Sequence, residues 1–214
     1  GGFLANDKQY NNDERSDLHF LHNWKIDEQW ETNLEFNQAS DKDYFSDFNH
    51  SPNTKTDLNL RRAWELNYQH GIPGLKAQFK VEDFQTLDKT IKDADKPYAR
   101  LPQFLLNYVT GNAQGLQYEF NNDTAYFKKS IEDDSALESS GTRIYNQLAM
   151  RYNYITPSWF YAIPEVSVRT VNTFYDQDSQ NGRGLSSDDL EKSVVVPQLS
   201  FATGITFEKE GKYL

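Results

Sequence analysis

Apolar and polar side chains alternate without a break in Trp30-Glu31-Thr32-Asn33-Leu34-Glu35-Phe36-Asn37. Successive side chains of a β-strand point to opposite faces, so this segment predicts a strand with one apolar and one polar face. The same period of two residues recurs in the segments 57–68, 75–82, 116–121, 143–154 and 160–169. A helix needs a period near 3.6 residues, and no helix of useful length fits these segments.

Working outward from these segments, we expect nine strands along the chain. Their predicted ranges are 16–26, 29–39, 56–69, 75–85, 98–109, 116–128, 142–155, 159–175 and 193–209. Short turns are predicted near residues 27–28, 70–74, 111–115 and 156–158, whereas long polar connectors are predicted at 40–56, 85–96, 129–141 and 176–192.

This alternation of short and long connectors is typical of outer-membrane barrels, whose periplasmic turns are short and whose extracellular loops are longer. Nothing in a soluble β-sandwich sorts loop lengths by end. The sequence therefore predicts an all-β fold, an up-and-down antiparallel transmembrane β-barrel of which this chain forms a segment of about nine strands. An odd number of strands with unpaired edges cannot close into a single-chain barrel, so we expect the segment to belong to a larger wall.

The composition excludes several classes of protein. The 22 Lys and Arg residues are outnumbered by 32 Asp and Glu residues, and the net charge of −10 disfavours a nucleic-acid partner. No apolar run is long enough for a transmembrane helix. A mean hydropathy of −0.83 is compatible with a barrel, since only half of each strand faces lipid and the loops are polar. With no cysteine in the chain, disulfides and thiolate metal sites are excluded.

Aromatic residues gather at the predicted strand ends, where the amphipathic rings of an interfacial girdle belong. The set near the short turns comprises Trp24, Trp30, Tyr68, Tyr108, Tyr154, Trp159 and Tyr161, and the set near the long connectors comprises Phe36, Phe84, Tyr98, Tyr126 and Phe174. Trp159 and Tyr161 fit less well, because they share the parity of the polar face. The alternative is that these rings form the core of a soluble sheet.

The strand parity also predicts which side chains face the lumen and which face lipid. The lumen-facing candidates are Asn33, Glu35, Arg61, Glu65, Lys80, Glu119, Arg143, Arg151 and Glu165. The lipid-facing candidates are Leu34, Phe36, Leu60, Leu66, Phe79, Phe120, Leu148 and Val166. Arg62 has the parity of the lipid face, so we expect a bulge, a partner or a snorkelling side chain there.

No catalytic, metal or cofactor site is predicted. His19 and His22 would point to opposite faces of a strand, which disfavours a zinc pair. Asp41, Asp43 and Asp47 could supply calcium ligands, but no EF-hand pattern accompanies them, and we favour solvation or hydrogen bonding that structures the loop. Scattered carboxylates such as Glu31, Glu35 and Glu65 are better explained as lumen lining than as a glycosidase pair.

Several stretches of the chain form a recognisable set: 1–4, Asp13-Glu14-Arg15-Ser16 leading into 18–24, Ser40-Asp41-Lys42-Asp43-Tyr44-Phe45-Ser46-Asp47-Phe48, Arg100-Leu101-Pro102-Gln103 and 197–204 followed by Phe207-Glu208. These stretches resemble the barrel domain of the LptD family of outer-membrane lipopolysaccharide-assembly proteins. The resemblance runs along nearly the whole chain, and the Ser40 to Phe48 element is its most specific part.

The resemblance implies a function in transport rather than an enzyme. Residues 1–214 would be an internal part of one barrel domain in the outer membrane of a Gram-negative cell, without the family's periplasmic jelly-roll domain. The barrel would insert lipopolysaccharide into the outer leaflet. Its expected partners are lipopolysaccharide, the lipoprotein plug LptE inside the barrel, and the periplasmic bridge protein LptA, which would bind through an N-terminal domain that these residues lack. The gate and cysteine residues of the family have no counterpart here.

Two other functions remain open from the residues alone. One is a different outer-membrane channel of the porin type, which the Ser40 to Phe48 element and the total number of strands would distinguish. The other is a soluble carbohydrate-binding β-sandwich that uses its Tyr and Trp residues as stacking platforms.

Overall fold

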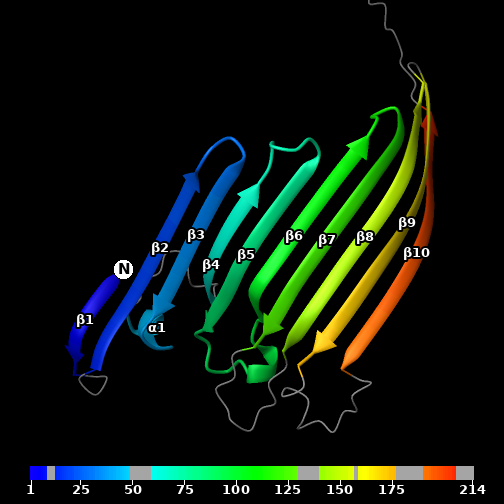
Figure 1. The fold of residues 1–214 in the computed structure, drawn as a ribbon. Coiled ribbons are helices and arrows are strands. Elements are labelled where there is room, and N and C mark those ends of the chain that lie inside the picture. The colour runs from blue at the N-terminus through cyan, green and yellow to red at the C-terminus, as the bar shows by residue number, and fades with distance from the viewer. Residues whose placement is uncertain (9–12, 49–58, 130–139, 157–158, 177–189, 206–214) are drawn as a thin grey trace, which may run out of the picture.

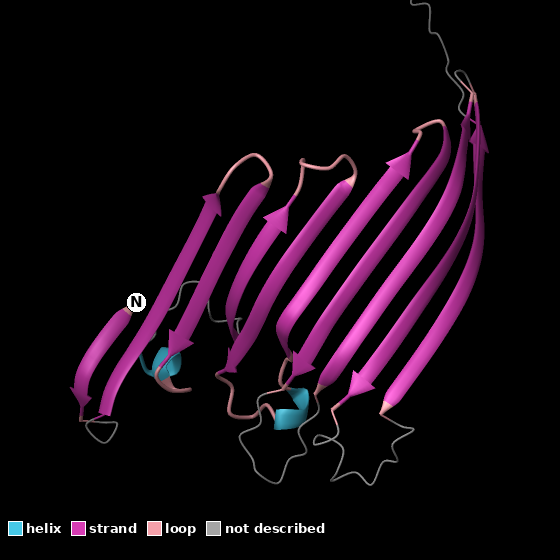
Figure 2. Cartoon of the chain, viewed as in Figure 1, coloured by secondary structure: helices cyan, strands magenta, loops and turns pink. Residues whose placement is uncertain are grey.

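Ten strands form one antiparallel sheet in which every strand pairs with its neighbours in the sequence (Figures 1 and 2). The structure, a computed structural model, describes residues 1–8, 13–48, 59–129, 140–156, 159–176 and 190–205. The strands are β1 (Gly2–Asp7), β2 (Asp13–Lys25), β3 (Trp30–Ala39), β4 (Asn59–Tyr68), β5 (Leu75–Thr86), β6 (Ala99–Gly111), β7 (Gly115–Lys128), β8 (Gly141–Ile155), β9 (Phe160–Tyr175) and β10 (Glu191–Ile205). The all-β prediction and its antiparallel order are confirmed.

The described residues form one strand more than the nine expected, because β1 was not among the predicted strands. Its residues Gly2, Phe3, Leu4 and Ala5 do not alternate with polar residues, so the period of two is absent. Pairing with β2, in which Phe3 lies opposite Ser16, makes this segment a strand. Tertiary pairing therefore overrides a weak local pattern. The other nine strands lie where they were predicted, within a few residues at each end.

Short turns lie together at one edge of the sheet, which is the upper edge in Figure 1. In the first of them, one carboxylate oxygen of Asp27 accepts hydrogen bonds from the backbone N–H groups of Gln29 and Trp30, at 2.7 and 2.8 Å. Asp is favoured in turns for this kind of bond. The turn between β6 and β7 has positive φ values of 112° at Gly111 and 114° at Gly115, which glycine adopts without a steric cost.

The opposite edge carries two short helical elements, α1 (Tyr44–Phe48) and the 3₁₀ helix η1 (Asp93–Asp95). Both lie in connectors that were predicted to be long and polar. The described residues contain no helix with the length and apolar character needed to cross a membrane. The predicted turn at 156–158 and the predicted long connectors at 40–56, 129–141 and 176–192 lie partly outside the described residues.

The sheet is open and has a single layer. β1 and β10 each pair with one neighbour only, and large apolar side chains such as Leu148 (52% exposed) and Leu199 (83% exposed) have no second layer over them. The buried apolar residues are mainly alanines of the sheet, with a small cluster of Ala39, Tyr44 and Leu60 beside α1. A soluble sandwich would need a second sheet on the apolar face, and the described residues form none.

Candidate functional site: the polar face and the Arg15 cluster

All nine lumen-facing candidates lie on one face of the sheet, which we call the polar face. Residues opposite each other on adjacent strands share a face. In the register of the sheet, Asn33 lies opposite Glu65, which lies opposite Lys80. On the later strands Glu119 lies opposite Ala149. Arg151, two residues beyond Ala149 and on the same face, lies opposite Glu165. The parity of the sequence therefore groups the candidates as predicted, although whether this face lines a lumen stays a prediction.

All eight lipid-facing candidates have the register of the other face, which we call the apolar face. Leu34 lies opposite Trp64, Leu66 opposite Phe79, and Phe120 opposite Leu148, which in turn lies opposite Val168. Most of this set is half-buried or exposed. Leu60 differs, because it is 4% exposed and packs with Ala39 and Tyr44 beside α1.

Arg61 is the centre of an ion-pair network on the polar face. Its guanidinium donates to Glu35 at 2.7 Å, to Glu65 at 2.6 Å and to Glu82 at 2.7 Å. Lys80 lies 3.4 Å and Arg100 3.0 Å from the other oxygen of Glu82, which is 5% exposed. The partners come from β3, β4, β5 and β6, so one network crosses four strands.

A second set of charged and amide pairs continues across the polar face to β9. Arg151 binds Glu119 and lies 3.8 Å from Glu165. Two amide pairs lie on the same face, with Gln78 donating to Asn67 at 2.7 Å and Asn107 donating to Asn121 at 2.6 Å. Both signs of charge are paired along this face, which suits a hydrated surface better than a strongly selective ion pore.

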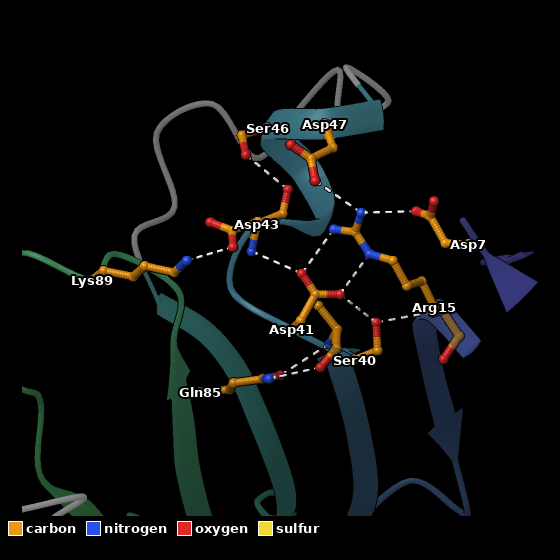
Figure 3. A network of polar contacts seen from close by, with 11 residues as sticks. Asp7, Arg15, Ser40, Asp41, Asp43, Ser46, Asp47, Gln85 and Lys89 are labelled. Carbon is orange, nitrogen blue, oxygen red and sulfur yellow. Dashed lines mark hydrogen bonds and ion pairs between the residues drawn. The ribbon is translucent and has the colours of Figure 1, made fainter. Parts of the chain in front are cut away.

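Arg15 forms the second candidate site, at the edge of the sheet where α1 lies (Figure 3). It is 2% exposed, and its guanidinium donates to both oxygens of Asp41 at 2.8 and 2.9 Å, to Asp47 at 2.8 Å and to Asp7 at 3.2 Å. The rings of Tyr44 and Phe48 lie 5.7 and 4.8 Å from its guanidinium carbon. The Arg15 cluster thereby joins β1, β2 and the α1 connector.

The predicted loop carboxylates are hydrogen-bonded to side chains that structure this connector. Asp41 and Asp47 bind Arg15, and Asp43 binds Lys89 from the next connector. Among the described residues, no group of three or more His, Asp or Glu side chains is placed to hold a metal ion. The position of Arg15 was not predicted from its strand, although Asp13-Glu14-Arg15-Ser16 and the Ser40 to Phe48 element carry the family resemblance and contact each other here.

Two groups of the Arg15 cluster have shifted pKa values. Burial of Asp41 acts to raise its pKa, but hydrogen bonds from Arg15, Ser40 and the backbone of Asp43 outweigh burial, so its pKa is lowered. Burial, together with a hydrogen bond to Asp17, raises the pKa of Tyr44 to about 12. Near neutral pH the cluster therefore contains a carboxylate at Asp41 and a neutral phenol at Tyr44.

Arg62, a charged residue with the parity of the apolar face, has partners for its guanidinium. Its Nε donates to the carbonyl oxygen of Asn37 at 3.1 Å, another guanidinium nitrogen donates to Gln85 at 3.1 Å, and the ring of Phe36 lies 5.5 Å away. Backbone pairing of β3 with β4 ends at Phe36 and Arg62. Beyond that point Gln85 accepts from the N–H of Ala39 at 3.0 Å and donates to its carbonyl at 2.7 Å, replacing a backbone pair.

The histidines fit the sequence prediction. His19 lies opposite Asn37, whereas His22 lies opposite Leu34, so the two rings point to opposite faces. His19 hydrogen-bonds the Asn37 side chain.

Sequence reasoning missed Glu82 and Gln85. In the sequence Glu82 looks like any other acidic residue of a strand. The bonds of Gln85 to Ala39 depend on where the pairing of β3 with β4 ends, which the sequence of β5 does not indicate.

Comparison with known proteins gives a consistent result along the chain. The family described as LptD, LPS transport system D, matches residues 13–214. The chain is 72% identical over its whole length to the LPS-assembly protein LptD of Acinetobacter baumannii and 63% identical to that of Acinetobacter baylyi, covering 26% of each. Identity to the LptD of Psychrobacter arcticus is 38% over 99% of the chain and 24% of that protein. The chain thus spans about a quarter of the length of these curated relatives.

Proposed function

Because this chain belongs to the LptD family, we propose that it forms part of the wall of an outer-membrane barrel that delivers lipopolysaccharide to the outer leaflet. Residues 1–214 would then be part of one barrel domain in a Gram-negative outer membrane. The apolar face contacts lipid in this proposal, and the polar face borders the hydrated interior. β1 and β10 continue the wall by pairing with further strands.

The observation that carries this proposal is the separation of the two faces within a single layer. The apolar face exposes many large side chains, among them Leu148 (52% exposed) and Val166 (43% exposed), and a soluble monomer rarely exposes a continuous apolar surface without a partner. On the other face the charges are paired within the sheet, as in the Arg61 network. A membrane on one side and water on the other satisfy both faces.

The polar face also supports a proposal for partners. We assign to it the contact with lipopolysaccharide in transit and with the lipoprotein plug LptE, since both need hydrogen-bonding groups and Asn67, Gln78, Asn107 and Asn121 supply amides there. The periplasmic bridge protein LptA would act outside these residues. The function is transport and assembly, and no catalytic role is assigned to any residue.

A photo-crosslinking experiment tests the two faces directly. A benzophenone amino acid is placed at position 147 or at position 148 of the full-length protein in living cells, since Gln147 and Leu148 are neighbours on opposite faces. We expect lipopolysaccharide or plug adducts from position 147 and phospholipid adducts from position 148. Adducts to neither lipopolysaccharide nor the plug from position 147, or extraction of the protein from membranes without detergent, would contradict the proposal.

A further inference from the structure

A cavity of about 320 Å³ lies on the polar face where β7, β8 and β9 reach the long-connector edge of the sheet. One row of the ladder crosses it, with Phe127 on β7, Gly141 on β8 and Tyr175 on β9. The middle position has no side chain, and a Cβ there would overlap the carbonyl oxygen of Phe174. Phe127 and Tyr175 therefore lie on either side of a position that has no side chain, and Tyr98 also lines the cavity.

The spacing of the strands leaves room for one six-membered ring. β7 and β9 are separated by two steps of the ladder, about 9.5 Å in all. A ring held between two aromatic side chains needs two carbon contacts of about 3.5–4.0 Å each, or about 7–8 Å. The backbone spacing between Phe127 and Tyr175 is therefore wide enough for one such ring above Gly141.

The polar groups around the cavity indicate the chemistry of the ligand. Arg143 is the charged residue among the residues that line the cavity, and none of these lining residues carries a carboxylate. Its side chain is 45% exposed, its guanidinium carbon lies 4.9 Å from the Phe127 ring, and its contact with Asp123 is long at 3.5 Å. A guanidinium held over a ring is preorganised to bind a carboxylate or phosphate through two hydrogen bonds. Thr173, opposite Arg143, adds a hydroxyl.

We propose that this cavity binds a pyranose ring that bears a carboxylate or a phosphate. The apolar C–H face of the sugar packs against Phe127 or Tyr175, its acidic group binds Arg143, and a ring hydroxyl bonds to Thr173. A cavity near 300 Å³ that is lined by aromatic residues together with polar ones, here Ser140, Thr142, Arg143 and Thr173, has the size of a small-molecule site. The inference rests on the proposed function, because a glycolipid passing the polar face would present such sugars here.

The test measures binding of three probes to the full-length protein in detergent micelles by saturation-transfer NMR. Methyl glucuronide has the ring and the acid, methyl glucoside has the ring alone, and inorganic phosphate has the charge alone. We expect methyl glucuronide to bind at least tenfold more tightly than either of the others. Equal binding of phosphate and methyl glucuronide would overturn the proposal, since it would indicate an anion site without ring recognition.

Variants separate the two parts of the site. Arg143→Gln should abolish the tenfold preference for methyl glucuronide over methyl glucoside, whereas Phe127→Leu should weaken both sugars. Arg169→Gln, on the same face but outside the cavity, is the matched control and should bind all probes as the parent does. Thr173→Val keeps the shape of the side chain, removes the hydroxyl and should also weaken both sugars. This variant provides the test if Arg143→Gln or Phe127→Leu prevents assembly. Unchanged sugar binding in Arg143→Gln and in Thr173→Val would overturn the proposal.

Two further outcomes separate this cavity from the proposed function. If cells deliver lipopolysaccharide normally and the purified protein binds no sugar, the cavity proposal fails alone. If methyl glucuronide binds as expected and delivery of lipopolysaccharide does not depend on the protein, the cavity stands and the transport function fails. Sugar binding that is present only after the plug lipoprotein is removed would assign the cavity to the plug and overturn the proposal.

Discussion

Arg15 and Arg61 each bind three carboxylates, yet they stabilise different things. Arg61 draws its partners from adjacent strands that the backbone ladder already holds together, and its side chain is 33% exposed. Arg15 is 2% exposed and binds Asp41 and Asp47, which lie in the α1 connector outside the ladder. The same ion chemistry therefore balances charge on the polar face in one place and fixes a connector in the other.

The largest effect is expected from removing the charge of Arg15. Arg15→Gln leaves the largely buried carboxylates of Asp7 and Asp41 without their counter-charge, and breaking a buried ion pair typically costs about 3–5 kcal/mol. Arg61→Gln is the matched variant, and we expect a loss of only about 1 kcal/mol, because Arg61, Glu35 and Glu65 are partly exposed and the buried Glu82 keeps Lys80 and Arg100 as partners. Urea unfolding of the full-length protein in micelles measures both changes. Equal losses in the free energy of unfolding would show that the two arginines stabilise the protein to the same extent and would contradict this distinction.

A slightly smaller loss of stability is expected when a charge is introduced on the apolar face. Phe79→Arg places a charge on the apolar face, at a cost of about 2–4 kcal/mol if the site lies near the bilayer midplane. Lys80→Gln, one residue along on the polar face, should leave assembly intact, although Lys80 lies near Glu82. Membrane fractionation with heat-modifiable gel mobility, together with surface lipopolysaccharide levels, compares the variants. Equal assembly of both variants would reverse the assignment of the faces.

A third, smaller effect is expected from the Gln85 side chain, whose hydrogen bonds stabilise the long-connector edge of the sheet beyond the end of the β3–β4 pairing. Gln85→Leu removes both bonds to the Ala39 backbone and one to Arg62, and unpaired polar groups cost about 1–3 kcal/mol when water cannot reach them. Gln78→Leu, which breaks an amide pair within the ladder, is the control and should cost less. Hydrogen exchange at the Ala39 amide should rise in the first variant alone. Unchanged exchange there would mean that water replaces the amide.

The strands were predictable because a period of two leaves a clear signal wherever one face is apolar. Leu34, Leu66 and Leu148 could be placed on one face from parity alone, and the register bears out their grouping. The Arg15 cluster and the Gln85 contacts could not be predicted, because their partners are up to 46 residues away in sequence and lie where the ladder ends. Contacts of that kind depend on the path of the connectors, which carries no periodic signal.

The smallest expected effect is a pH dependence confined to the Arg15 cluster. The folded-state pKa of Asp41 is lowered, so its contribution to stability is present above the ordinary carboxyl pKa of about 3.9 and is lost as the pH falls through the lower folded value. Between pH 5 and pH 8 this group should change nothing. Below about pH 4, hydrogen exchange of the α1 amides should rise before that of the central strands. Asp41→Asn should raise hydrogen exchange of the α1 amides at neutral pH and should remove the part of the rise below pH 4 that is due to Asp41. An equal rise below pH 4 in Asp41→Asn and in the parent would assign the titration to another carboxylate. At the alkaline end, the pKa of about 12 at Tyr44 keeps its phenol protonated, so its contribution is complete below pH 10 and is lost only as the pH rises toward 12.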